Sequence, residues 1–154
     1  MKNGFTMIEL IFVIIIIGIL SAVAIPKMMA TRDDAQITKV RSDISTIRSA
    51  IINLRNKNML KGDSSYPEYL DDAEKNKEGE ELFDGNSSIG YLLDYPIISK
   101  NANGHWMKTD DRKYNVKILD TDVEFDYTPN DRGHFDCKGL NSGKANDICK
   151  QLTN

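Results

Sequence analysis

The sequence predicts an α+β fold in which one long N-terminal helix packs on a small antiparallel β-sheet. Three observations predict this fold. Residues 5–26 form an almost uninterrupted apolar stretch, residues 27–60 carry apolar side chains at helical spacing, and residues 105–154 contain segments in which apolar and polar side chains alternate. Residues 61–104 show neither pattern, and we expect them to connect the helix to the sheet.

The apolar stretch is long enough to cross a membrane. From Phe5 to Ile25 it holds 21 residues with one charged side chain, Glu9. As a helix, these residues span about 31 Å at about 1.5 Å per residue, which matches a bilayer hydrocarbon core of about 30 Å. We therefore expect residues 5–26 to form a transmembrane helix.

Composition alone leaves two other interpretations of this stretch open. A secretory signal peptide would use Lys2 as its positively charged start and Ala22-Val23-Ala24 as its cleavage site. An ordinary single-span anchor would leave Glu9 unexplained, because an ionised carboxylate near the membrane core costs about 2.5–3.5 kcal/mol. An acid inside a membrane segment therefore indicates a function for that side chain.

The first ten residues, MKNGFTMIEL, resemble the class III leader of type IV pilins and type II secretion pseudopilins. In that family a short basic leader ends in Gly, and an aspartyl prepilin peptidase cuts after it. The new N-terminal residue, usually Phe, is N-methylated, and a Glu stands four residues further on. The resemblance, which is specific over residues 1–30, implies a leader at residues 1–4, cleavage between Gly4 and Phe5, methylation of Phe5, and an assembly role for Glu9.

The resemblance also gives Glu9 a partner. Cleavage after Gly4 creates an amine on Phe5, and in a staggered bundle Glu9 of one subunit can meet the Phe5 amine of a neighbour. A buried carboxylate is tolerated when it is paired with a cation, and such pairs can set register. Pro26 falls where many family members carry a helix-kinking proline, so we expect it to take part in assembly too. In a lone subunit, Glu9 can instead lie at the level of the lipid headgroups.

After Pro26 the pattern becomes amphipathic, and we expect one continuous helix from Phe5 to about Asn58. Pro26 removes one backbone donor and can bend the helix without ending it. A short coiled coil is the alternative, but the strands that follow need covering, so we expect the stripe to pack on the sheet. The apolar positions are spaced by three and four residues: Ile37, Val40, Ile44, Ile47, Ile51 and Leu54.

The remaining residues predict the connection and the sheet. Within residues 61–104, one or two short helices are expected, around Glu68–Asn76 and Ile89–Asp94. Period-two alternation then predicts an antiparallel meander with one buried face, and Asp110-Asp111 and Asp120-Thr121 are its expected turns. The candidate strands are residues 105–109, 114–118 and 123–127, with residues 133–137 as a further edge strand.

Two cysteines, Cys137 and Cys149, enclose eleven residues near the C-terminus. In an exported domain such a pair indicates one disulfide, and it resembles the disulfide-bounded C-terminal region of type IV pilins. Two free thiols are the alternative. A zinc site with His105 and His134 is a further one, although the spacing matches no known ligand pattern.

Charge and motifs exclude several other functions. Residues 1–61 carry a net charge of +5 and residues 62–154 carry −8, which disfavours a strongly basic nucleic-acid binder. The sequence has no glycine-rich phosphate loop, no nucleophile elbow and no metalloprotease motif, so we expect no enzyme activity, no cofactor and no metal. Acidic turns are a weaker indication of a calcium site, formed either by Asp120, Asp122 and Asp126 or by Asp131 with Asp136. The triplet Asn86-Ser87-Ser88, with Asp84 two residues ahead, is a weaker indication of N-glycosylation.

We therefore expect a structural subunit of a type IV pilus-like filament, held in the inner membrane by a single span, with its C-terminal domain in the periplasm. The assembled homo-oligomer would lie in the periplasm or at the cell surface. The partners implied by the resemblance are the prepilin peptidase, the assembly platform and motor, and minor pilins. The alternatives are a pseudopilin of a type II secretion or DNA-uptake system, and a membrane-anchored binding module that never polymerises.

Overall fold

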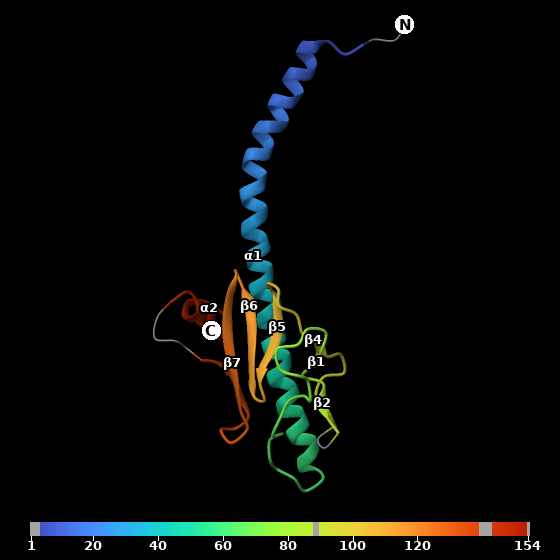
Figure 1. Ribbon diagram of the computed structural model, residues 1–154, viewed down its shortest axis with the longest axis vertical. Coiled ribbons are helices and arrows are strands. Elements are labelled where there is room, and N and C mark those ends of the chain that lie inside the picture. Colours follow the sequence, from blue (N-terminus) through green and yellow to red (C-terminus); the bar gives the residue numbers. More distant parts are fainter. Residues whose placement is uncertain (1–3, 88–89, 139–142, 154) are drawn as a thin grey trace. The chain divides into compact units, whose positions relative to one another are not determined.

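The computed structural model describes residues 4–87, 90–138 and 143–153, and for residues 26–30 it describes the backbone alone. The chain divides into two compact units, Met1–Ala35 and Gln36–Asn154. Figure 1 shows the elements of both, and each unit is described separately below. The predicted α+β class is confirmed, since one long helix and small antiparallel sheets make up the chain.

The long helix, α1, runs from Met7 to Met59, close to the predicted limits of Phe5 and Asn58. Its backbone stays helical through Pro26, as expected for a proline that removes only one donor. In the first unit, the segment Met7–Ile25 has a mean hydropathy of 3.0 and none of it is buried. By length and composition it is able to cross a membrane, and it is the one helical segment of the described residues that meets this test.

The second unit is built on a four-stranded sheet whose strands follow one another in sequence order. The strands are β5 (His105–Asp110), β6 (Lys113–Ile118), β7 (Thr121–Thr128) and β8 (His134–Cys137). Every neighbouring pair is antiparallel, so the predicted meander and its edge strand are confirmed. Tight turns join β5 to β6 and β6 to β7 close to the expected positions.

Helix α1 covers one face of this sheet within the second unit (Figure 1). Alternate residues of each strand point toward the helix, so that face of the sheet is buried. The residues between them lie on the opposite face and are partly exposed to solvent. Seven ring contacts between aromatic side chains fill the centre. The helical stripe is buried almost completely at Val40, Ile44, Ile47, Ile51 and Leu54, and partly at Ile37.

The prediction of short helices in the connection is wrong. In the described residues between Met59 and Lys144 there is no helix, and the predicted segment Ile89–Asp94 begins at a residue outside that description. Two short antiparallel pairs form instead: β1 (Glu81–Leu82) with β4 (Ile97–Ile98), and β2 (Gly85–Asn86) with β3 (Gly90–Tyr91).

The cause is competition from side chains for the backbone. Asp71 accepts hydrogen bonds from the backbone N–H of Ala73 and of Phe83, and the hydroxyl of Ser99 holds the N–H of Glu80. Asn76, the last residue of the first predicted helix, has a positive φ of 56°, which an α-helix does not tolerate. Local side-chain bonds of this kind replace the helical ladder that the apolar spacing alone suggested.

A C-terminal helix, α2 (Lys144–Thr153), was not predicted. It buries Ile148, Cys149 and Leu152 against β7 and β8, and the guanidinium of Arg41 donates to the carbonyl of Gln151 near its end, with Nε at 2.7 Å. The sequence signal was the helical spacing of these three side chains after Gly143. The predicted disulfide loop at this end therefore contains a helix.

Candidate functional site

The N-terminus of α1 holds the residues that the sequence singled out. Thr6 precedes the first helical residue, and its hydroxyl accepts a hydrogen bond from the N–H of Glu9 at 3.3 Å. The carboxylate of Glu9 reaches back to accept from the N–H of Thr6 at 2.9 Å and from its hydroxyl at 2.8 Å. These bonds form a capping box, which satisfies orphan donors at the start of a helix.

Sequence reasoning missed this use of Glu9. The pattern Thr6-x-x-Glu9 just before an apolar run is the sequence signature of a capping box, and it was present. The carboxylate therefore has partners within its own chain, and its negative charge lies in the first turn, where the helix dipole favours it.

Gly4 and Phe5 lie before the helix begins. The Phe5 side chain is 83% exposed, and the Cβ position of Gly4 has no neighbour within 4 Å. Exposed backbone outside helices and strands is the kind of substrate that a protease can bind, whereas a helical segment must first unwind. The structure therefore leaves the expected cleavage point accessible, while Met1, Lys2 and Asn3 of the leader lie outside the described residues.

The other predicted assembly residue, Pro26, lies within the helical backbone of α1, but its side chain is outside the described residues. Between Phe5 and Ile25, large apolar side chains point outward around the helix, with exposures of 43–83%. An apolar surface of this extent on a helix is stable only in lipid or against other apolar helices. Glu9 is the one acid of this segment.

In the second unit Cys137 and Cys149 form a disulfide, with Cα atoms 5.9 Å apart. The bond ties α2 to β8, and closing a loop of this size contributes about 3 kcal/mol in the chain-entropy model. Because both sulfurs are used, the structure contradicts the free-thiol and zinc alternatives. His134 instead places Nδ1 3.3 Å from a carboxylate oxygen of Asp136.

Both edges of the four-stranded sheet are covered at their centres. On β8, the Nε of Arg48 donates to the carbonyl of Phe135 at 2.9 Å, and the same guanidinium pairs with Asp136. On β5, the carbonyls of Trp106 and Lys108 accept from residues of the connection, at 2.9 and 2.8 Å. Covered edges of this kind do not offer a ready ladder for strands of another chain.

Of the candidate metal ligands, Asp126 and Asp136 lie opposite each other on β7 and β8, but they do not form part of a larger group in the described residues. No group of three or more His, Cys, Asp or Glu side chains there could hold an ion. Asp120 accepts from the side-chain amide of Asn103 at 2.8 Å, and Asp126 lies 3.2 Å from the ammonium of Lys138. The candidate glycosylation triplet includes Ser88, which lies outside the described residues.

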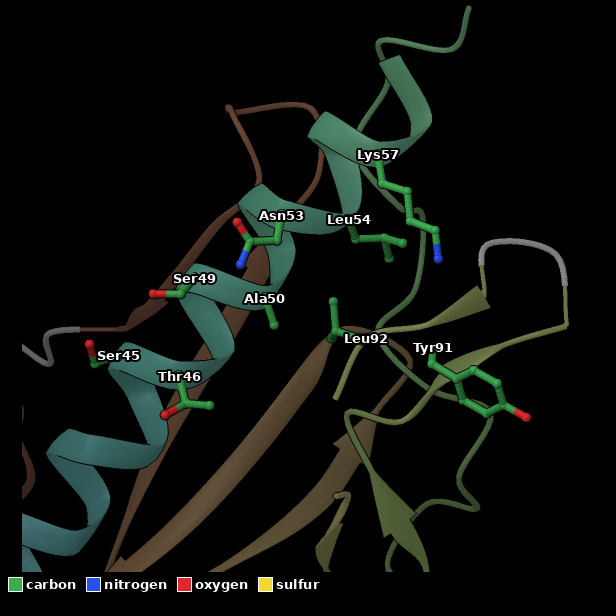
Figure 2. Close-up of a pocket in the computed structure, with 9 residues that line it drawn as sticks. All are labelled: Ser45, Thr46, Ser49, Ala50, Asn53, Leu54, Lys57, Tyr91 and Leu92. Carbon is green, nitrogen blue, oxygen red and sulfur yellow. The ribbon is translucent and has the colours of Figure 1, made fainter. Parts of the chain in front are cut away.

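A surface groove of about 420 Å³ lies between α1 and β3 (Figure 2). Ser45, Ser49 and Asn53 line it from successive turns of α1, while Tyr91 stands at its rim with its ring directed outward. The described lining holds no carboxylate, imidazole or thiol, and its one charged side chain is that of Lys57.

The comparisons with known proteins agree with the N-terminal features. The family model described as the prokaryotic N-terminal methylation motif matches residues 1–25. The type II secretion system core protein G of Pseudomonas aeruginosa is 40% identical over 50 residues, which cover 32% of this chain and 35% of that protein. The type IV major fimbrial protein FimA of Dichelobacter nodosus is 43% identical over 51 residues, or 33% of each chain.

A fimbrial protein of Pseudomonas aeruginosa is likewise 43% identical over 49 residues, 32% of each chain. The match thus spans about a third of the length of these relatives, and no solved structure matches. The resemblance stated from residues 1–30 is confirmed, because both kinds of protein that it named are among the relatives found.

Proposed function

We propose that this chain is a structural subunit of a type IV pilus-like filament, assembled from the inner membrane after leader cleavage and N-methylation. One observation carries the proposal: the methylation motif leads directly into an apolar helix with no described side chain buried and a single acid near its start. A signal peptide or an ordinary anchor accounts for the apolar residues, but neither requires Gly4, Phe5 and Glu9 at their positions.

The proposed mechanism is assembly rather than chemistry on a substrate. A prepilin peptidase removes residues 1–4 and methylates Phe5, and the apolar helix of residues 5–26 then leaves lipid to bundle with those of other copies. Glu9 pairs with the Phe5 amine of a neighbouring copy, which neutralises a charge that is costly in an apolar core. Pro26 bends the helix where its apolar part meets the amphipathic part at residues 27–60.

The second unit would form the outer shell of the filament, outside the cytoplasm. The disulfide supports a periplasmic location, because such bonds persist in oxidising compartments. The assembly platform, the motor and minor pilins are the further partners that this function requires. Direct nucleic-acid binding is not part of it, and neither is enzyme activity.

A second candidate function is that of a pseudopilin, supported by the 40% identity to a type II secretion core protein G. Such a subunit builds a short filament that serves secretion or DNA uptake. Electron microscopy of the native cells separates the two functions: long surface filaments support the pilin. Loss of secretion or of transformation in a deletion strain without such filaments supports the pseudopilin.

N-terminal sequencing and intact mass of the membrane-extracted protein test the proposal directly. We expect the chain to begin at Phe5 and to carry one methyl group. A chain that begins at Met1 or at Ile25 would contradict the proposal, because Glu9 would then lack its partner. Gly4→Leu should block leader cleavage. If this variant keeps its biological activity, the chain is a membrane-anchored module that does not polymerise, and the filament proposal is wrong.

A further inference from the structure

An ion pair lies inside the core of the second unit. The ammonium nitrogen of Lys108, on β5, is 2.8 Å from Oδ1 of Asp71 and 3.2 Å from the backbone carbonyl of the same residue. The side chains of Lys108 and Asp71 are 5% and 0% exposed. Two opposite charges are thus held in contact, with almost no water.

The second oxygen of Asp71 is held by two donors. The hydroxyl of Tyr114 donates to Oδ2 at 2.8 Å, and the backbone N–H of Phe83 donates to it at 2.9 Å. Burial, together with the charge of Asp71, raises the pKa of Tyr114, so its hydroxyl keeps its proton and remains a donor. Oδ1 faces the amine, and Oδ2 faces the two donors.

The surroundings are largely aromatic and buried, with Asp84 as a further carboxylate close enough to act on Asp71 and Tyr114. The rings of Phe83 and Tyr114 lie 4.5 Å apart between centroids, and Trp106 meets Phe83 edge-on at 5.9 Å. A buried ion pair bears a desolvation penalty that its attraction often fails to repay. Transfer of one proton from the ammonium to Oδ1 removes both charges and leaves an amine beside a carboxylic acid, which are the reactants of an amide bond.

We propose that Lys108 and Asp71 join covalently as an intramolecular isopeptide bond. The Nζ lone pair attacks Cγ of the protonated Asp71 side chain, and negative charge develops on Oδ2, where Tyr114 and Phe83 donate hydrogen bonds. A second proton passes from the nitrogen to the Oδ1 hydroxyl, the Cγ–Oδ1 bond breaks, and one water leaves. The reaction is a condensation without oxidation or reduction, so it needs no cofactor.

Two physical factors favour the reaction. The fold holds the amine and the carboxyl in contact, which replaces the entropy cost of a bimolecular encounter. The donors on Oδ2 are fixed before charge develops, and in a water-excluded site such donors act strongly. The product would link residues 37 positions apart and fasten the connection to β5, whether or not the chain forms filaments.

The test is the mass of the purified, folded full-length chain. We expect it to be lower by one water than the mass calculated for its cleaved, methylated and disulfide-bonded form. After digestion, tandem mass spectrometry should find the peptide that contains Asp71 joined to the peptide that contains Lys108. Recovery of both peptides only in unlinked form overturns the proposal and leaves an ordinary buried ion pair. The wild-type mass decides the matter without any variant.

Lys108→Arg is the control for other dehydrations. It keeps the positive charge beside Asp71, but the guanidinium is not a useful nucleophile, so the loss of one water should disappear. An Asp-Gly step can also lose water by forming a backbone succinimide, and Asp84-Gly85 is such a step. Persistence of the loss in Lys108→Arg would place the dehydration at a site of that kind and would overturn the isopeptide.

Discussion

Thr6 and Glu9 cap the first turn of α1 reciprocally: the Thr6 hydroxyl accepts from the Glu9 N–H, and the Glu9 carboxylate accepts from the Thr6 N–H at 2.9 Å. Glu9 thus has two roles that can be separated. It supplies oxygen acceptors for the start of the helix within a subunit, and it supplies a negative charge for the proposed contact between subunits.

Three substitutions separate the two roles. Glu9→Gln keeps an oxygen acceptor of similar reach but removes the charge, so we expect normal membrane insertion and loss of filaments. Thr6→Ala keeps the charge and removes the hydroxyl that accepts from the Glu9 N–H, which costs about 1 kcal/mol of helix stability, so filaments should persist at reduced yield. Glu9→Leu loses both. Electron microscopy and sedimentation of sheared filaments measure assembly, and membrane fractionation measures insertion.

The opposite ranking would contradict the charge pairing. If Glu9→Gln assembles as the wild type does while Thr6→Ala fails, the cap is what assembly needs. If all three variants fail to insert into the membrane, the residues act before assembly, and the filament proposal is not tested by these substitutions but by the N-terminal mass.

A second prediction concerns Gly133, which lies in the turn before β8. Its φ is +65°, and a Cβ there would lie 2.3 Å from the ring of Tyr66. That ring also lies 4.7 Å below the guanidinium of Arg55, so it has little freedom to retreat. We expect Gly133→Ala to lose about 1–3 kcal/mol from overpacking, in addition to the strain of a positive φ. Thermal unfolding of the detergent-solubilised chain, followed by near-ultraviolet circular dichroism of the aromatic core, measures it.

Gly79→Ala is the matched control for Gly133→Ala. Gly79 has a φ of +82°, but no atom lies within 4 Å of its Cβ position, so this variant bears only the backbone strain. Equal losses in the two variants would show that Tyr66 yields without cost.

The elements that could be predicted from the sequence are those in which the spacing of apolar residues follows the buried face of a helix or strand. The stripe from Val40 to Leu54 and the alternation of residues 114–118 each face one continuous apolar surface, so spacing alone places them. The connection could not be predicted in this way. There Asp71, buried at 1% exposure, organises the backbone through hydrogen bonds, and neither its burial nor its partner Lys108 has a local sequence signal.

The candidate site shows the same division. A motif within the first ten residues singled out Gly4, Phe5 and Glu9 for processing and assembly, whereas the capping box of Thr6 and Glu9, which is equally local, was missed. Helix α2 was missed because its apolar side chains were treated as part of a surface loop between cysteines. Its position depends on contacts with β7 and β8, and these contacts exist only once the sheet has formed.

A third prediction concerns the disulfide between Cys137 and Cys149. Reduction should lower the free energy of unfolding of the second unit by about 3 kcal/mol, since the unfolded chain regains loop entropy. Amide hydrogen exchange should rise first in α2, whose contacts with β7 and β8 the bond supports. The double variant Cys137→Ser/Cys149→Ser is the control. It should match the reduced wild type and show no further response to reductant, and a further response would point to an effect elsewhere.

A fourth prediction follows from His105, at the start of β5. Partial burial, and then the charges of Lys39 and Lys100, lower its pKa from the ordinary 6.5, while Asp43 acts weakly in the opposite direction. The unfolded state therefore binds a proton more readily than the folded state does. The contribution of His105 to the free energy of unfolding should be fully present above pH 6.5. It should fall as the pH drops from there through the lower pKa of the folded state.

The test compares the midpoint of thermal unfolding at neutral and at mildly acidic pH in the wild type and in His105→Gln. Because Gln does not titrate, the variant should lose less stability on acidification than the wild type, and the difference should lie in the window just below pH 6.5. Lys39→Gln removes one of the cations that lower the pKa of His105. At a given acidic pH, this variant should therefore lose less stability than the wild type does. A steeper acid dependence in His105→Gln than in the wild type would reverse the sign and contradict the assignment.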